Sequence, residues 1–161
     1  MISKTMQDAI NEQMKNELFS SYLYLSMAAY FADEGWDGMA AWMHKQADEE
    51  KEHGMKFFNY LVEREGRVEL KAIDKPKHSW ESPLDAFREA LEHEKFITAK
   101  IHELYEKATE EKDSATRIFL EWYVDEQVEE EASVSKIVQM LERIDGHMSG
   151  MYMLDSQLAK R

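Results

Sequence analysis

Cysteine is absent from this chain of 161 residues, so neither a disulfide framework nor a thiolate metal site can form. Long apolar runs are absent as well. The longest uncharged stretch, from Leu18 to Ala32, is too short to cross a bilayer and is interrupted by serines. The first residues lead into no apolar signal core. We therefore expect a soluble protein of the cytoplasm with no membrane partner.

Basic residues are scarce relative to acidic ones, with 20 Lys and Arg against 33 Asp and Glu and a net charge of -13. Such a chain lacks the basic surface that binding to the nucleic-acid backbone normally needs, and it attracts cations instead. We expect no nucleic-acid partner. At 161 residues and 43% hydrophobic content, the chain can bury a core of its own as one domain over residues 1–161.

Breaks in the helical pattern divide the chain into four long helices and a short tail. We expect a tight turn at Gly35 and a short break at Lys112–Ser114, whereas the stretch from Gly66 to Ser82 is the only long connection. Short, long and short connections predict two antiparallel hairpins joined by a crossover, with the second and third helices running in the same direction. The expected fold is all-α, with a four-helix bundle over about 4–145 and a short fifth helix over about 147–159.

Each long helix carries a seam, meaning a row of residues spaced alternately three and four apart, as on a helix face buried in a bundle. All four seams are interrupted near their middle by polar residues. The seams are Ile10, Met14, Glu17, Ser21, Tyr24 and Ala28; Met39, Met43, Gln46, Glu50, His53, Phe57 and Tyr60; Phe87, Leu91, Glu94, Thr98, Ile101, Tyr105 and Ala108; and Leu120, Tyr123, Gln127, Glu130, Val134, Ile137 and Leu141.

The central polar residues repeat within the chain at a fixed offset of 77 positions. At this offset, the two hairpins are related by approximate twofold symmetry, which would place both polar sets around one central site. The first set is Glu17, Glu50 and His53, and the second, in the same order, is Glu94, Gln127 and Glu130.

Four glutamates at core positions need a counter-charge. A carboxylate buried without a partner costs several kcal/mol, against a net stability of ~10 kcal/mol for a typical domain. No lysine or arginine lies on the seams, so ion pairs with side chains are not expected to neutralise the four glutamates. Two divalent cations would balance the four charges. Oxygen donors with one imidazole and no thiolate suit iron or manganese better than a closed structural zinc site. Iron is our first expectation, although zinc could also bind these ligands.

On these residues, the chain resembles the bacterial and archaeal non-haem ferritins over essentially its whole length. The resemblance implies a first iron held by Glu17, Glu50 and His53. It implies a second iron held by Glu50, Glu94 and Glu130, with Glu50 bridging the two. The fourth helix departs from the Glu-x-x-His pattern by carrying Gln127-x-x-Glu130, and Gln127 is expected close to the oxygen-binding side.

The resemblance also implies further roles, for which the residues leave a second interpretation open. Glu49, Glu126 and Glu129 match a third, more exposed iron position, although acidic residues beside a seam are usually only solvated. Tyr24 lies two turns after Glu17, where the family places a tyrosine near the iron pair. It could hydrogen-bond a ligand, supply an electron during oxidation, or fill the core.

Iron storage with ferroxidase activity is the function that the resemblance implies. Fe(II) would be oxidised by O2 or hydrogen peroxide at the paired irons, and ferric mineral would collect inside a homo-oligomeric shell of twenty-four subunits. Two alternatives remain open. A di-iron oxidase or peroxidase without a shell is weakened by the absence of rubredoxin-type cysteine pairs. A shell scaffold without catalysis is disfavoured by the complete set of ligands.

Haem is not expected as a cofactor. Haem-binding bacterioferritins place a methionine ligand between the glutamate and the histidine of the second helix, and this chain has Lys51 there, which cannot do the same. We predict that the purified native protein shows no Soret band in its absorbance spectrum. A Soret band in proportion to the protein would contradict this assignment.

Overall fold

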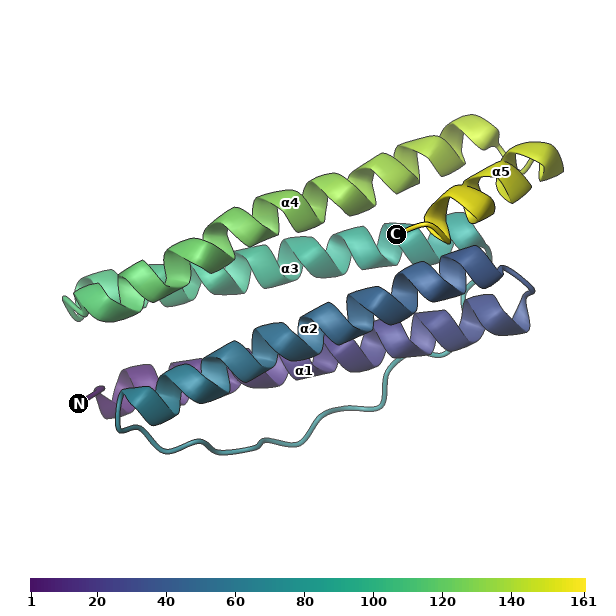
Figure 1. Ribbon diagram of the computed structural model, residues 1–161. Coiled ribbons are helices and arrows are strands. Elements are labelled where there is room, and N and C mark those ends of the chain that lie inside the picture. The colour runs from purple at the N-terminus through teal and green to yellow at the C-terminus, as the bar shows by residue number, and fades with distance from the viewer.

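Five α-helices and no strand make up the computed structural model, which describes residues 1–161. None of the helices combines the length and the apolar character that crossing a membrane requires. In Figure 1, the first two long helices form one antiparallel hairpin and the next two form the other, with the short helix across one end. The helices are α1 (Lys4–Asp33), α2 (Asp37–Glu63), α3 (Pro83–Glu110), α4 (Ser114–Ile144) and α5 (Met148–Leu158).

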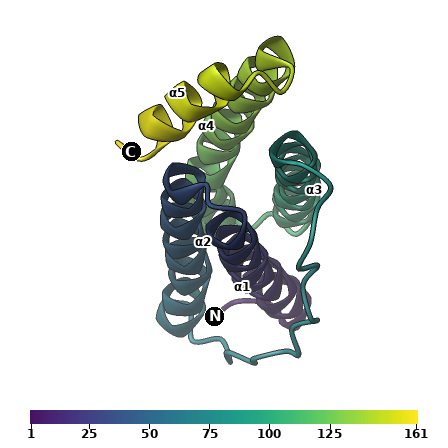
Figure 2. The same ribbon diagram turned by 90° about the vertical axis from the view of Figure 1, so that its right-hand side faces the viewer.

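The crossover between α2 and α3 runs outside the bundle along its length (Figures 1 and 2), so that α2 and α3 point in the same direction. Polar side chains of α1 hold it in place. Asn11 donates from Nδ2 to the carbonyl of Arg67 at 3.0 Å and accepts from the backbone N–H of Glu69 at 2.9 Å. Ser26 donates to the carbonyl of Lys77 at 2.6 Å. The predicted four-helix bundle with one long crossover and a short fifth helix is confirmed.

Local signals define where the long helices begin and turn. Ser3, Ser82 and Asp113 each accept a hydrogen bond from a backbone N–H of the first turn that follows, so three of the five helices have a side-chain N-cap. Pro83 occupies the first position of α3, where its missing N–H has no partner to lose. Gly35 turns the chain between α1 and α2 with φ +79°, a conformation that L side chains rarely adopt.

Two apolar clusters fill the bundle, one toward each end. The cluster near α5 contains 21 buried residues, among them Phe31, Met43 and Phe87, and the other contains 13, among them Ile10 and Phe57. The layer between them is polar, because the interruptions of the four seams meet there. The packing at both ends therefore fixes the separation of the helices around a buried polar centre.

The second and fourth seams are buried at every predicted position, but the first and third need correction. On α1, Ser20 is buried and Ser21 only half-buried. On α3, the predicted positions Leu91, Thr98 and Tyr105 are half-buried, and the neighbours that are buried are Ala90, Ile97 and Leu104. A straight helix has 3.6 residues per turn, so a strict seven-residue repeat drifts around it, and the buried stripe becomes wider than one seam.

Gly38 provides a test of how α5 docks on the bundle. A Cβ at this position would lie 1.8 Å from the backbone oxygen of Asp155 in α5, whose carboxylate accepts from the N–H of Met39 at 2.8 Å. We expect Gly38→Ala to displace α5, to destabilise the protein by about 1–3 kcal/mol, and to increase hydrogen exchange over residues 148–158.

Gly150→Ala is the matched control, because its added Cβ would meet only side-chain atoms of Ile144, starting at 3.0 Å, and these can shift. Alanine is otherwise the better helix former by roughly 1 kcal/mol, so a loss of stability in Gly38→Ala isolates the collision with α5. Unchanged exchange in α5 would contradict the close contact.

Candidate metal centre

The six central polar residues of the seams meet in one buried layer at the middle of the bundle. Each of the four long helices contributes, and none of the six side chains belongs to a residue more than 5% exposed. The residues are Glu17 from α1, Glu50 and His53 from α2, Glu94 from α3, and Gln127 and Glu130 from α4.

Three groups of side chains could hold a metal ion, because the ligand atoms within each group lie within 4.8 Å of one another. The first group is Glu17, Glu50 and His53, and the second is Glu50, Glu94 and Glu130. These are the two sets implied from the sequence, and Glu50 belongs to both. A carboxylate has two oxygens, so a shared glutamate can bridge two neighbouring cations.

The third group differs from the set implied by the sequence. It consists of His53, Glu126 and Glu130, with His53 Nε2 3.8 Å from Glu126 Oε1. Glu49 and Glu129 do not join it. Glu49 instead pairs with Arg161 near the end of the chain at 2.6 Å, and Glu129 is exposed. Sequence spacing cannot show that the two nitrogens of one imidazole face different helices, because this depends on the rotamer of His53.

Burial dominates the electrostatics of the centre. It raises the pKa of Glu17 and Glu50 well above the usual 4.5, and repulsion from neighbouring carboxylates adds to the effect. It also raises the pKa of Glu94 and of Glu130 to about 7. One oxygen of Glu17 and one of Glu50, both Oε2, are buried without a hydrogen-bond partner. Unpartnered oxygens, an imidazole and no thiolate fit a hard or borderline divalent cation.

Two buried glutamines support the carboxylates, and neither was predicted from the sequence to have a role. Gln13 donates to Glu17 at 2.8 Å, and Gln46 donates to Glu50 at 3.1 Å and to Glu130 at 2.7 Å. Each glutamine precedes a central glutamate by four residues, which places the pair on neighbouring turns of one helix face. This spacing of four residues was the feature of the sequence that could have identified both glutamines. Gln127, which was predicted at the centre, donates to Glu94 at 3.1 Å.

Two buried tyrosines also bond to the centre. Tyr24 donates from its hydroxyl to Glu94 Oε1, which is the first of the roles considered for it from the sequence. Burial, and then the nearby carboxylate of Glu94, raise the pKa of Tyr24 well above its usual value, so the phenol keeps its proton at neutral pH. Tyr123 donates to the backbone carbonyl of His53 at 2.7 Å. Both bonds help to position residues of the central layer.

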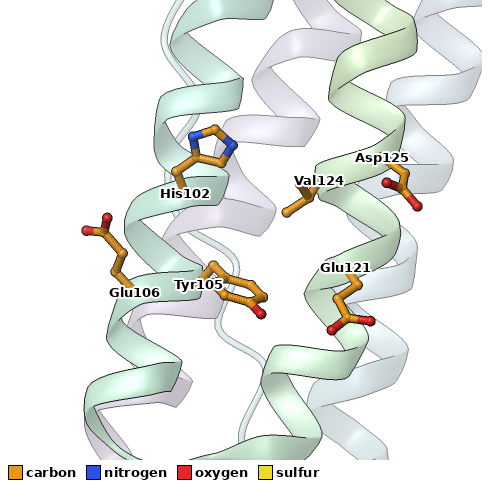
Figure 3. Close-up of a pocket in the computed structure, with 6 residues that line it drawn as sticks. All are labelled: His102, Tyr105, Glu106, Glu121, Val124 and Asp125. Carbon is orange, nitrogen blue, oxygen red and sulfur yellow. The ribbon is translucent and has the colours of Figure 1, made fainter.

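The surface pocket shown in Figure 3 lies between α3 and α4 and is separate from this centre. It has a volume of about 400 Å³ and is lined by His102, Tyr105, Glu106, Glu121, Val124 and Asp125. Glu106 points away from α4 in the figure, so the acidic side chains of the pocket do not converge on one point. None of its residues belongs to a group that could hold a metal ion.

The fold and the centre define a class of protein, namely a four-helix bundle whose helices each direct a carboxylate into a buried site suited to metal ions. The sequence profile of the Ferritin family, described as a ferritin-like domain, matches residues 7–144. The chain therefore belongs to the ferritin family.

Ferritins from other organisms are similar in sequence to this chain over its full length. A bacterial non-heme ferritin of Bacteroides fragilis is 42% identical over 161 residues, which is 100% of both chains. One from Staphylococcus aureus is 38% identical over 100% of this chain and 97% of its own. Among solved structures, an open-pore ferritin of the archaeon Archaeoglobus fulgidus superposes with a TM-score of 0.99 at 48% identity, covering 100% of this chain and 99% of that one.

The raised carboxylate pKa values predict how the metal-free protein responds to pH. In the folded state Glu94 and Glu130 titrate near pH 7, whereas in the unfolded chain they titrate near 4.5. The folded state therefore holds more protons between these values, and the free energy of unfolding falls as pH rises through 7. We expect a loss on the order of 5 kcal/mol between pH 5 and pH 8, about half from each carboxyl group, measured by urea unfolding of the metal-free protein.

Glu130→Gln tests the cause, since a neutral amide of the same shape cannot lose a proton. This variant should be more stable than the native chain at pH 8 and equal to it at pH 5. Glu52→Gln, on the exposed side of α2, is the control and should leave the pH profile unchanged. Stability that rises from pH 5 to pH 8 in the metal-free native protein would refute this account.

Proposed function

We propose that this protein stores iron and that it oxidises Fe(II) to Fe(III) at the buried centre formed by Glu17, Glu50, His53, Glu94 and Glu130. The observation that carries the proposal is the position of Glu50, which belongs to two adjacent groups of potential ligands. A shared carboxylate is suited to hold two cations side by side. Family membership and the names of the relatives, bacterial non-heme ferritins, support iron as the cargo.

The side chains bind, orient and neutralise, while iron supplies the redox chemistry. Two ferrous ions would provide two electrons to O2 or to hydrogen peroxide. Because the pKa values of Glu94 and Glu130 lie near 7, iron binding would release the protons that these two carboxyl groups still carry at neutral pH. Gln127, next to Glu94, is proposed to face the oxidant, and Tyr24 to orient Glu94 or to provide a further electron.

A third iron position on Glu49, Glu126 and Glu129, as the resemblance implies, remains part of the proposal. The arrangement of His53, Glu126 and Glu130 supports a cation leaving the paired positions toward Glu126. Glu126 is half-buried and Glu129 exposed, so this position lies between the buried centre and the surface.

Storage needs a cavity, and one bundle cannot enclose it, so we propose a homo-oligomeric shell of twenty-four subunits. Large apolar side chains at the surface are available for contacts between subunits. Five of them, Leu70, Ile118, Val128, Tyr152 and Met153, are 62% to 75% exposed. The similar archaeal ferritins are described as an open-pore form and an engineered closed form, which also fits a shell. A cytoplasmic location remains a prediction from the sequence.

Aerobic loading with a large excess of Fe(II), followed by size-exclusion chromatography with protein and ferric absorbance read together, tests the function. Ferric iron far above a few ions per subunit, eluting with a large particle, is the expected result. Fast oxidation without retained iron would overturn storage and favour a catalytic oxidase. Slow oxidation at the rate of the buffer alone would overturn the oxidation site and favour a scaffold.

Glu50→Ala should abolish fast oxidation, since both metal positions lose a ligand. The initial rate of ferric absorbance at two Fe(II) per subunit should fall by at least about 100-fold, because the loss of outer partners alone typically costs 10–100-fold. Glu52→Ala removes an exposed carboxylate from the same helix and should oxidise Fe(II) at the native rate. Native kinetics in the Glu50 variant would exclude this assignment.

A further inference from the structure

Gln46 lies one helical turn before Glu50 on α2 and is completely buried at the level of the metal centre. Its Nε2 donates to Glu50 Oε1 at 3.1 Å and to Glu130 Oε2 at 2.7 Å. The NH2 end of the amide therefore faces both carboxyl groups. The other end, Oε1, is buried without any hydrogen-bond partner, so this side chain leaves its own acceptor unsatisfied in order to donate twice.

The contacts of Gln46 differ from those of the other two central glutamines. Gln13 and Gln127 each donate to one carboxylate, Glu17 and Glu94 respectively. Gln46 joins two carboxylates that come from different helices, α2 and α4, and both belong to the second group of potential ligands. Its nitrogen is therefore within hydrogen-bond distance of two of the three carboxylates that a second cation would need.

The first metal position would be formed by Glu17, Glu50 and His53, and the second by Glu50, Glu94 and Glu130. The two differ in how many of their carboxylate oxygens already accept a hydrogen bond. Glu17 Oε2 and Glu50 Oε2 are buried and have no hydrogen-bond partner, and both residues belong to the group that includes His53. Nδ1 of His53, itself a potential ligand, lies 3.3 Å from Glu50 Oε2. A cation can reach these two oxygens without displacing a hydrogen bond. At the second position, Glu50 Oε1 and Glu130 Oε2 are already bonded to Gln46, and a hydrogen bond to a charged oxygen is among the stronger ones in proteins.

We propose that Gln46 is a positioning residue that holds the second metal position closed in the metal-free protein and is displaced when a cation binds there. This inference rests on the proposed function and adds an order of filling. The first position binds a cation before the second, because only the second must release Gln46. Between cations, the amide bridges Glu50 and Glu130 and keeps their side chains in place.

Gln46→Leu tests this inference, because leucine keeps most of the volume and removes both donors. Purified protein without iron is titrated with Co2+, which has the charge of Fe(II), and the heat of binding is measured. The native chain should show a tighter and a weaker class of site. In Gln46→Leu, the affinity of the weaker class should rise about tenfold, since no donor competes for its oxygens.

Gln13→Leu is the matched control. Gln13 precedes Glu17 by four residues, as Gln46 precedes Glu50, and its substitution removes a donor to Glu17 only. It should leave the affinity of the weaker class unchanged. Crystals soaked with one Co2+ per subunit identify the classes by anomalous scattering. The native crystals should show the ion beside Glu17 and His53, and those of Gln46→Leu should show it at both positions.

The outcomes separate this inference from the proposed function. If native protein binds no Co2+ at either position, the proposed metal centre is wrong. If it binds two ions and Gln46→Leu leaves the weaker class unchanged or weakens it, the centre stands and the inference about Gln46 is overturned. If the variant does not fold, the test is the position of Gln46 in native crystals in which both metal positions hold Co2+. Nε2 still bonded to both Glu50 and Glu130 overturns the inference, and Nε2 separated from either supports it.

Discussion

Burial of four carboxylates in one layer of a helical bundle is the constraint on which the rest of this structure depends. Glutamates shielded from water repel one another and hold protons that they would lose in solution, as the raised pKa values of Glu94 and Glu130 indicate. Amides and a phenol provide some compensation, but one oxygen of Glu17 and one of Glu50 receive nothing. A site with this deficit favours cations, and this physical property connects the fold with the proposed oxidation of iron.

The apolar clusters on either side of this layer make the unfavourable burial possible. With 21 and 13 buried residues, they fix the helices from both ends, so the carboxylates cannot reach solvent by a local movement of one helix. The crossover held by Asn11 and the docked α5 extend the same support to the outside of the bundle. The centre is consequently enclosed by well-packed apolar layers on both sides.

The approximate symmetry of the two hairpins does not extend to the supporting side chains. At the offset of 77 residues, Gln13 corresponds to Ala90 and Gln46 to Tyr123. At these two positions, the hairpin of α1 and α2 has amide donors to its glutamates, whereas the second hairpin has an alanine and a tyrosine that bonds to the backbone of His53. The amide donor of the second hairpin, Gln127, stands instead at the position that corresponds to Glu50. The two groups of potential ligands are therefore unequal in charge and in the donors that support them.

The sequence by itself determined the helices, the crossover and the set of central residues, because each depends on local spacing along a helix or on the length of a connection. It also pointed to the family through Glu17, Glu50, His53 and Glu94. Only the tertiary structure decided that α3 buries Ala90, Ile97 and Leu104, that His53 faces Glu126, and that Arg161 holds Glu49. These features depend on how far each helix is rotated and on the rotamers of side chains from different helices, and no spacing within one segment contains that information.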